Sequence, residues 1–259
     1  MKTANDWDPS LYLKFDRERT RPSLDLVGRV ILAAPERILD LGCGPGNSVP
    51  GMLARWPQAK ITGIDSSSAM VSQARDSYPD QSWSVGDARK LDPAQRYDLV
   101  FSNAVIQWIP DHETLLIDLL KVVSPGGGLA VQIPNYGLMP ISSLVDELFL
   151  PFARPGSEPR YDRIFTVHGP EFYANLLGPR TRSFDLWETS YFHFLPSSRA
   201  VVTMLESTGL RPYLDVLDGD SSKKEFLDAV EQGIGRLHQT LADGTVLFPF
   251  RRLFFVAYP

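Results

Sequence analysis

The chain has 259 residues, of which 43% are hydrophobic and 22% are charged, and this suits one sizeable globular domain or a domain with an inserted cap. Its 26 Lys and Arg against 31 Asp and Glu give a net charge of -5, which argues against a protein that binds duplex nucleic acid by neutralising phosphates. The single cysteine, Cys43, excludes an intrachain disulfide, and the four histidines show no metal-ligand spacing. We expect neither a metal site nor a nucleic-acid partner.

The N-terminal stretch MKTANDWDPS is polar and acidic and lacks the apolar core of a signal peptide. No stretch approaches the roughly 18 uninterrupted apolar residues that a membrane-spanning helix needs. We therefore expect a cytoplasmic protein that makes no membrane contact and is a monomer or a weak dimer.

Short apolar runs alternate with helical segments through the first half of the chain. The runs predict strands at 37–41, 60–64, 83–85, 98–102 and 129–133, with helices at 49–55, 69–76 and 113–123 and a glycine- and proline-rich loop at 124–128. This alternation is typical of an α/β fold with a doubly wound parallel sheet. Because ligands bind at the carboxyl ends of such strands, residues 42–46, 65–66, 87–88 and 103–108 should share one rim.

The alternation lapses after Ile133, where prolines separate short amphipathic pieces. We interpret 137–182 as an inserted, mainly helical cap, after which strands at 183–194 and 250–257 and helices at 197–207 and 222–239 complete the chain. The expected division is a helical lid segment at 1–30, a cofactor-binding core at 31–136, the cap at 137–182, and the rest of the core sheet with a helical insertion at 183–259.

The stretch ILDLGCGPGNS (Ile38–Ser48) follows a strand with three glycines in five positions, so that a ligand can touch the backbone. A tight turn without a ligand is the alternative. A dinucleotide-binding fingerprint would place its third glycine at position 47, which is Asn47. This disfavours a nicotinamide oxidoreductase. We interpret Cys43 as a small side chain that fills the loop, because no histidine lies near it in the sequence.

Three further signals fall on the same predicted rim. Asp65 ends the second strand, where a carboxylate can accept hydrogen bonds from both hydroxyls of a ribose, although a helix N-cap is the alternative. Asp87 follows the third strand, where it could accept from an adenine amino group or serve only as a turn residue. Asn103–Trp108 leave the fourth strand.

Together these four signals resemble the class I S-adenosylmethionine-dependent methyltransferases in order and spacing. The resemblance implies a Rossmann-like sheet, mostly parallel with an antiparallel last strand, and S-adenosyl-L-methionine as cofactor with S-adenosyl-L-homocysteine as product. It also implies that the glycine loop lies close to the amino acid end of the cofactor and that Asp40 orients the methionine ammonium. The residues expected to bind the cofactor are Tyr12, Arg21, Asp40, Gly42, Gly44, Gly46, Asp65, Ser66, Met70, Asp87, Ala88, Asn103 and Trp108.

Fragments outside the cofactor motif make the resemblance narrower. DWDPSLYLKFDRERTRP (Asp6–Pro22), QWIPDHETL, TGLRPYL and RRLFFVA resemble the trans-aconitate methyltransferase branch of the family over nearly the whole chain. This implies methyl transfer to a carboxylate oxygen of trans-aconitate, giving a monomethyl ester. A carboxyl methyltransferase for another small polyacid or for an acyl-carrier-bound carboxylate is one alternative, and a non-catalytic cofactor-binding module is another.

A carboxylate with a pKa near 4 is already a nucleophile at neutral pH, so we expect no general base and no catalytic side chain. Proximity and orientation should do most of the work. Cations and polar aromatics should hold the small tricarboxylate. The expected substrate-binding residues are Trp7, Tyr12, Arg19, Gln107, Trp108, Tyr191, His193 and Arg251, with Arg21, Arg160, Arg163 and Arg252 as further candidates. Solvated surface charge is the alternative for each arginine. Core packing is the alternative for Trp108, and a hydrogen-bonded structural histidine is the alternative for His193.

Overall fold

The computed structural model describes residues 15–153 and 160–259. Contacts divide the chain into two compact units, each of which brings together segments far apart in the sequence. Unit 1 comprises Met1–Ile133, His168–Glu188 and Leu253–Pro259, and unit 2 comprises Pro134–Val167 and Thr189–Arg252.

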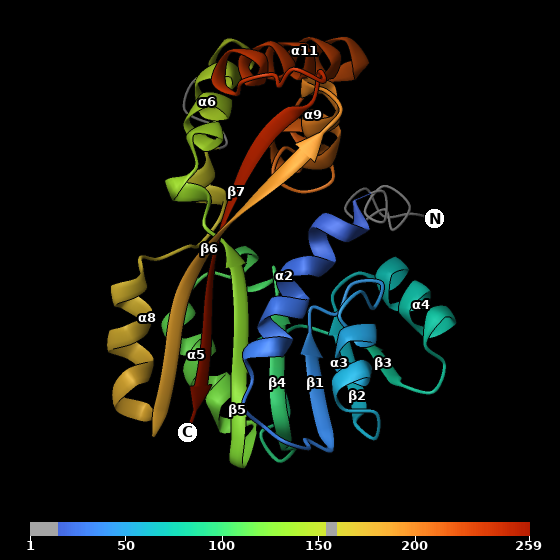
Figure 1. Cartoon of the computed structure of the whole chain (residues 1–259), viewed down its shortest axis with the longest axis vertical. Helices are drawn as coiled ribbons and strands as arrows, with labels where there is room; N and C mark the ends of the chain where they lie inside the picture. Colours follow the sequence, from blue (N-terminus) through green and yellow to red (C-terminus); the bar gives the residue numbers. More distant parts are fainter. Residues whose placement is uncertain (1–14, 154–159) are drawn as a thin grey trace. The chain divides into compact units, whose positions relative to one another are not determined.

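The described residues form a seven-stranded sheet in the order β3-β2-β1-β4-β5-β7-β6 (Figure 1). The pairs from β3 to β5 are parallel, as the sequence pattern predicted, and β7 runs antiparallel, as the resemblance to the methyltransferases implied. The strands are β1 (Arg37–Leu41), β2 (Lys60–Asp65), β3 (Ser82–Val85), β4 (Tyr97–Asn103), β5 (Val123–Pro134), β6 (Ser183–Leu195) and β7 (Val246–Tyr258).

The predicted loop at 124–128 was wrong, because these residues belong to β5. A Cβ on Gly127 would lie 2.5 Å from the carbonyl oxygen of Asp98, so the missing side chain lets β5 approach β4 closely. The register between these strands shifts between Tyr97 and Leu99. Local glycine and proline signals favour a loop, but pairing with β4 prevails here.

Helices connect the strands and fill the second half of the chain. Ser67 caps α4 by accepting from the backbone N–H of Met70 at 3.2 Å, and Asp111 caps α5 in the same way through Thr114 at 3.1 Å. The α-helices are α2 (Asp16–Arg29), α3 (Val49–Arg55), α4 (Ser68–Ser77), α5 (His112–Lys121), α6 (Pro140–Phe149), α7 (Tyr161–Ile164), α8 (Pro170–Leu177), α9 (Ser198–Glu206), α10 (Arg211–Asp215) and α11 (Gly219–Leu237). Short 3-10 helices are η1 (Ile106–Trp108), η2 (Tyr136–Leu138), η3 (Leu150–Phe152) and η4 (Gly178–Arg180).

The core of unit 1 lies along the central strands. Ile38, Leu39 and Leu41 of β1 are fully buried, as expected for a parallel strand covered on both faces. Tyr173 of α8 stacks on Phe255 of β7 with ring centroids 5.2 Å apart. The central strands are therefore held firmly, which fixes the positions of the residues at their carboxyl ends.

Unit 2 has an aromatic core of its own. The ring of Phe149 on α6 packs edge-on against Tyr213 and Phe226, with centroid distances of 5.3 and 5.1 Å. The Tyr213 hydroxyl donates to Asp146 at 2.5 Å. A Cβ on Gly233 would lie 2.9 Å from Leu144, so α11 and α6 pack closely at this glycine.

The units divide the chain differently from the four segments expected from the sequence. Helix α8, expected in the cap at 137–182, belongs to unit 1 because Tyr173 packs on the core. Residues 189–252, expected with the core sheet, group with α6 in unit 2. Of the expected lid segment at 1–30, residues 1–14 lie outside the described part of the chain.

Within 15–153 and 160–259, no helix is long and apolar enough to cross a bilayer. In the same ranges, no group of three or more His, Cys, Asp or Glu side chains is arranged to hold a metal ion.

Candidate cofactor site

The glycine loop follows β1 and is held against the end of β2. The backbone N–H groups of Gly42 and Cys43 both donate to the carbonyl of Ile64, at 2.7 and 3.1 Å. Gly42 and Gly44 have φ angles of 67° and 53°, in the left-handed region that glycine adopts readily. A Cβ on Gly42 would meet Val105 at 2.2 Å, whereas a Cβ on Gly44 would meet no atom of the described residues within 4 Å. Gly42 is therefore required for packing, and the bare side of Gly44 faces open space.

Asp65 ties this loop to the start of α4. One carboxylate oxygen accepts from the backbone N–H of Gly44 at 2.9 Å, and the other accepts from the N–H of Ser67 at 2.9 Å. Ser67, rather than Asp65, is the N-cap of α4. The carboxylate of Asp65 thus shapes the loop in addition to any role toward a ribose.

Asp40, the fourth residue of β1, is only 2% exposed, and its Oδ2 has no hydrogen-bond partner among the described residues. Burial, with the negative charge of Asp65 as a second cause, raises the pKa of Asp40 to about 7. A buried carboxyl without a protein partner is costly to keep charged. Its environment is suited to a cationic ligand group.

The segment after β4 contributes more buried acceptors. Ala104 has a φ of 58°, which is unusual for a residue with a side chain and is common at functional sites. Gln107 is 2% exposed and donates from Nε2 to the carbonyl of Ala104 at 2.8 Å, which fixes its amide group. Among the residues that the structure describes, neither Gln107 Oε1 nor Asn103 Oδ1 has a hydrogen-bond partner.

These acceptors lie at one rim, because β1 and β4 pair in parallel with Leu41 opposite Ser102. The rim therefore brings together Asp40, the glycine loop, Asn103 and Gln107, as the sequence predicted for residues that follow neighbouring strands. Asp87 lies on the same rim, because the backbone N–H of the preceding residue, Gly86, donates to the carbonyl of Asp65 at 2.9 Å.

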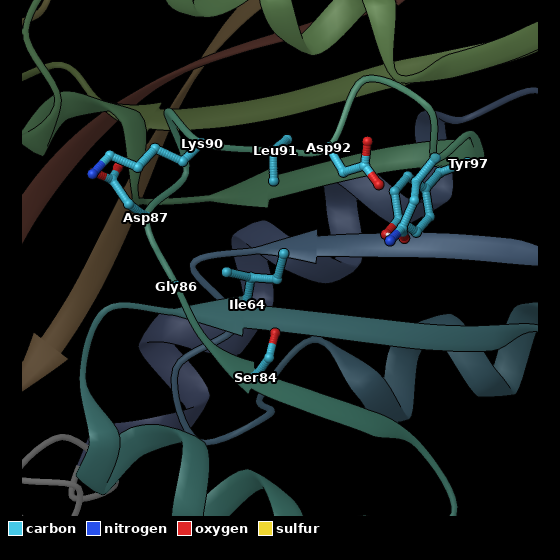
Figure 2. A pocket seen from close by; sticks show the side chains of 9 residues that line it. Ile64, Ser84, Gly86, Asp87, Lys90, Leu91, Asp92 and Tyr97 are labelled. Atoms are coloured by element: carbon cyan, nitrogen blue, oxygen red, sulfur yellow. Dashed lines mark hydrogen bonds between the residues drawn. The ribbon is translucent and has the colours of Figure 1, made fainter.

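Asp87 differs from Asp40 in its surroundings. Its carboxylate is partly exposed and binds the guanidinium group of Arg89 at 2.8 Å. Hydrogen bonds from the Arg89 side chain, and then from its backbone, lower the pKa of Asp87 to about 2. Asp87 also lines a pocket of about 200 Å³ that lies over Ile64 of β2 and Ser84 of β3 (Figure 2). Of the expected cofactor-binding residues that the structure describes, Asp87 alone lines this pocket.

A buried histidine supports the rim and was missed by the sequence analysis. His112 Nε2 lies 2.8 Å from the carbonyl oxygen of Ile106, so this nitrogen carries the proton. Nδ1, 2.9 Å away from the Tyr173 hydroxyl, is then the acceptor in the neutral ring. Burial is the main cause that lowers the pKa of His112. The histidine thus joins η1, which carries Gln107, to helix α8.

The other expected residues in unit 1 lie in different surroundings. On α2, Arg19 is buried and Arg21 is exposed. Met70 is buried in α4, and Trp108 is half-buried in η1. The remaining placements are Gly46 buried, Ser66 exposed and Ala88 half-buried, while Trp7 and Tyr12 lie outside the described residues. Burial raises the pKa of the Cys43 thiol, which therefore stays protonated.

The expected substrate-binding residues that come after Trp108 in the sequence lie in unit 2. Tyr191 and His193 are buried on β6. On β7, Arg252 is buried and places its guanidinium 4.6 Å from the centroid of the Phe250 ring, which also lies 6.0 Å from the His193 ring. Arg251 is half-buried and points to the other face, because neighbouring residues of a strand alternate. Arg160 and Arg163 are exposed.

Comparison with known proteins assigns the family. A methyltransferase domain model matches residues 38–127, which contain the loop and Asp87. A trans-aconitate 2-methyltransferase of Azoarcus sp. is 43% identical over 97% of this chain and 98% of its own length, and one of Escherichia coli is 42% identical over 98% of each. The chain belongs to the trans-aconitate 2-methyltransferase family.

Solved structures show the same fold at lower similarity. YcgJ of Bacillus subtilis is 12% identical with a TM-score of 0.58, and the alignment covers 91% of this chain and 97% of that protein. Phosphoethanolamine N-methyltransferase 2 of Haemonchus contortus, solved with S-adenosylhomocysteine, is 17% identical with a TM-score of 0.59, covering 92% of this chain and 52% of that protein. The [4+2]-cyclase SpnF is also similar, with a TM-score of 0.56, so the fold alone does not assign the reaction.

Proposed function

We propose that this protein transfers a methyl group from S-adenosyl-L-methionine to a carboxylate oxygen of trans-aconitate, with the monomethyl ester and S-adenosyl-L-homocysteine as products. Full-length similarity to trans-aconitate 2-methyltransferases supports the reaction. The buried Asp40, whose Oδ2 lacks a partner among the described residues, is the geometric observation that carries the proposal.

The residues at the rim fit this cofactor. A primary ammonium has three N–H donors and no acceptor, and Asp40, Asn103 and Gln107 offer three acceptor oxygens without protein partners in the described part of the chain. Gly44 leaves room beside the loop, since a Cβ there would meet no atom within 4 Å among the residues that the structure describes. We assign these residues to the amino acid end of the cofactor and Asp65 to its ribose.

S-adenosylmethionine, when bound, supplies an electrophilic methyl group on a positively charged sulfur. The acceptor carboxylate is ionised at neutral pH and attacks without a base. The S–CH3 bond breaks as the O–CH3 bond forms, and no proton has to move. The protein therefore acts by holding the acceptor in line and by excluding water, and such positioning can contribute roughly 7–11 kcal/mol in well-oriented systems.

For the acceptor we propose Tyr191, His193 and Arg252. All three are buried in unit 2, and the ring of Phe250 lies close to both His193 and Arg252. A planar guanidinium can bind a carboxylate through two parallel hydrogen bonds, and burial strengthens them. Arg251, on the opposite face of β7, is the second candidate.

A methyl-transfer assay with labelled S-adenosylmethionine tests the proposal. We expect label in an ester of trans-aconitate, and no comparable product from acids that lack its geometry. Arg252→Met should raise the KM for trans-aconitate about 10- to 100-fold, as for the loss of a hydrogen bond to a charged group, while the affinity for S-adenosylhomocysteine stays the same. Arg236→Met, an exposed arginine in the last turn of α11, is the matched control.

Three results would contradict parts of the proposal. Methylation of a different acid, with trans-aconitate inert, would move the assignment to another small polyacid or to a carrier-bound carboxylate. Cofactor binding without turnover on any acid would favour a binding module. A larger KM effect from Arg251→Met than from Arg252→Met would place the acceptor on the other face of β7.

A further inference from the structure

Arg89 makes an unusually complete set of contacts with Asp87. Its Nε donates to Oδ1 at 2.9 Å, its Nη2 donates to Oδ2 at 2.8 Å, and its backbone N–H donates to Oδ1 at 3.0 Å. The backbone of Lys90 closes the same turn by donating to the carbonyl of Asp87 at 2.9 Å. The carboxylate of Asp87 is thus fixed in rotation by three N–H groups of one neighbouring residue.

Folding stability does not account for this arrangement. The Arg89 side chain is 59% exposed and that of Asp87 is 30% exposed. Exposed ion pairs contribute little to stability, because solvent screens them and two side chains must be ordered. A fixed carboxylate does have value for recognition, since a group already oriented loses less entropy when a ligand binds.

The direction of the contacts matters as well as their number. An ionised carboxylate offers about four lone-pair sites and no donor. Arg89 occupies both oxygens and leaves acceptor capacity on the partly exposed carboxylate, which lies at the edge of the pocket shown with Lys90 and Leu91 (Figure 2). A carboxylate in this state can accept from an amino group, but it repels a carbonyl oxygen in the same position.

We infer that Arg89 is a positioning residue that makes the cofactor site selective for a 6-amino purine over a 6-oxo purine. This inference rests on the proposed binding of S-adenosylmethionine with adenine at Asp87. Arg89 holds the carboxylate of Asp87 in a fixed orientation, so that the adenine amino group donates to it. A hypoxanthine ring would instead bring an acceptor oxygen toward a fixed negative charge.

Titration calorimetry with S-adenosylhomocysteine and with its hypoxanthine analogue, S-inosylhomocysteine, tests the inference. Arg89→Met should weaken S-adenosylhomocysteine about 5- to 10-fold, the order expected for a weakened hydrogen bond to a charged group, and should reduce the preference over the inosyl analogue. Arg89→Lys should regain part of the affinity and part of the preference, because lysine keeps the charge but not the planar fork. In an Asp87→Asn background, Arg89→Met should have little further effect.

Arg96→Met is the matched control. Arg96 lies on the same connection between β3 and β4 and is exposed, but its guanidinium bonds to the backbone carbonyls of Pro93 and Gln95 rather than to an acid. Its loss should leave both affinities unchanged. Carbon NMR of the Asp87 carboxyl in the ligand-free protein gives an independent readout, in which Arg89→Met should raise the pKa from about 2 toward its ordinary value.

The outcomes separate the inference from the proposed function. Asp87→Asn could lower both the affinity for S-adenosylhomocysteine and the preference over the inosyl analogue while Arg89→Met changes neither. Arg89 would then have no positioning role, although the adenine assignment would stand. If neither variant has an effect on a protein that binds S-adenosylhomocysteine, the adenine does not lie at Asp87, and the inference is overturned with the cofactor assignment intact. A protein that binds neither ligand would overturn the proposed function, and the inference with it.

Discussion

Asp40 of β1 and Asp87 after β3 belong to the same rim and show opposite electrostatic behaviour; we call their surroundings the buried end and the exposed end of the proposed cofactor site. Asp40 is 2% exposed, and burial, followed by the charge of Asp65, raises its pKa to about 7. Asp87 is partly exposed, and hydrogen bonds from Arg89 lower its pKa to about 2. The same residue type is thus used in two ways.

The difference lies in where the compensating cation comes from. Asp87 has its cation in the chain, two residues away, so its carboxylate is ready before any ligand binds. Among the described residues, Asp40 Oδ2 has no partner, and its charge becomes favourable only when a cationic group arrives. We therefore expect the buried end to control affinity and its pH dependence, and the exposed end to control which base is bound.

The largest expected effect comes from removing the charge at the buried end. Asp40→Asn should weaken S-adenosylhomocysteine about 100-fold, within the range for losing one partner of a buried charge pair. The same variant should unfold at higher denaturant concentration than the wild type at pH about 8, where the wild type carries a costly buried charge. Calorimetry and denaturant titration measure the two effects. A variant that binds as tightly as the wild type would show that Asp40 does not meet the ammonium.

The stability effect has a defined pH window. The folded-state pKa of Asp40, about 7, lies above the ordinary value of 3.8, so the folded state holds this proton more tightly. The contribution of Asp40 to stability is fully present below pH 3.8 and is lost as the pH rises through about 7. The advantage of Asp40→Asn should therefore be largest above this pH.

The next prediction concerns the affinity itself as the pH changes. Because the ligand cation binds the ionised form of Asp40, affinity for S-adenosylhomocysteine should fall about tenfold per pH unit as the pH decreases below about 7. Asp87, with a pKa of about 2, should produce no inflection between pH about 4 and about 8. Calorimetry across pH, with Asp40→Asn as the control that should respond little, checks both statements. A pH-independent affinity in the wild type would contradict the comparison.

Much of the fold could be predicted because buried parallel strands have a simple pattern. β1 was predicted at its observed bounds, and the other four strands of the first half were located from apolar runs bounded by turns. The glycine loop was recognised because three glycines directly after a strand leave the backbone open to a ligand. The same residue type misled the prediction of a loop at 124–128, because the glycines there allow β5 to pair closely with β4.

The site could be predicted less fully, because its details depend on contacts between distant residues. Nothing in the sequence shows that His112 would meet Tyr173, 61 residues later, or that Ala104 would adopt a left-handed conformation. The choice between Arg251 and Arg252 depends on which face of β7 is buried, and only the structure provides that. Asp65 was expected to bind a ribose, but its contacts with Gly44 and Ser67 give it a role in the loop that spacing did not reveal.

Two glycine substitutions separate packing from ligand contact at the buried end. Gly42→Ala would place a Cβ 2.2 Å from Val105 and should lower the free energy of unfolding by about 2 kcal/mol. Gly44→Ala has room for its Cβ, so it should cost about 1 kcal/mol of conformational strain and weaken cofactor binding about tenfold. Denaturant titration and calorimetry on both variants measure this contrast. Equal effects on stability and binding in the two variants would show that both glycines serve the same purpose.

The smallest expected effect tests how the rim is supported. Tyr173→Phe removes the hydroxyl that lies 2.9 Å from His112 Nδ1 and leaves that nitrogen buried without a donor, at a cost of about 1–2 kcal/mol in unfolding free energy. The ring still stacks on Phe255, so the fold should persist. If the contact between His112 and Ile106 fixes η1, the variant should also weaken S-adenosylhomocysteine a few-fold through Gln107, which we assign to the amino acid end of the cofactor. A loss of stability without any change in this affinity would show that the histidine supports the core alone.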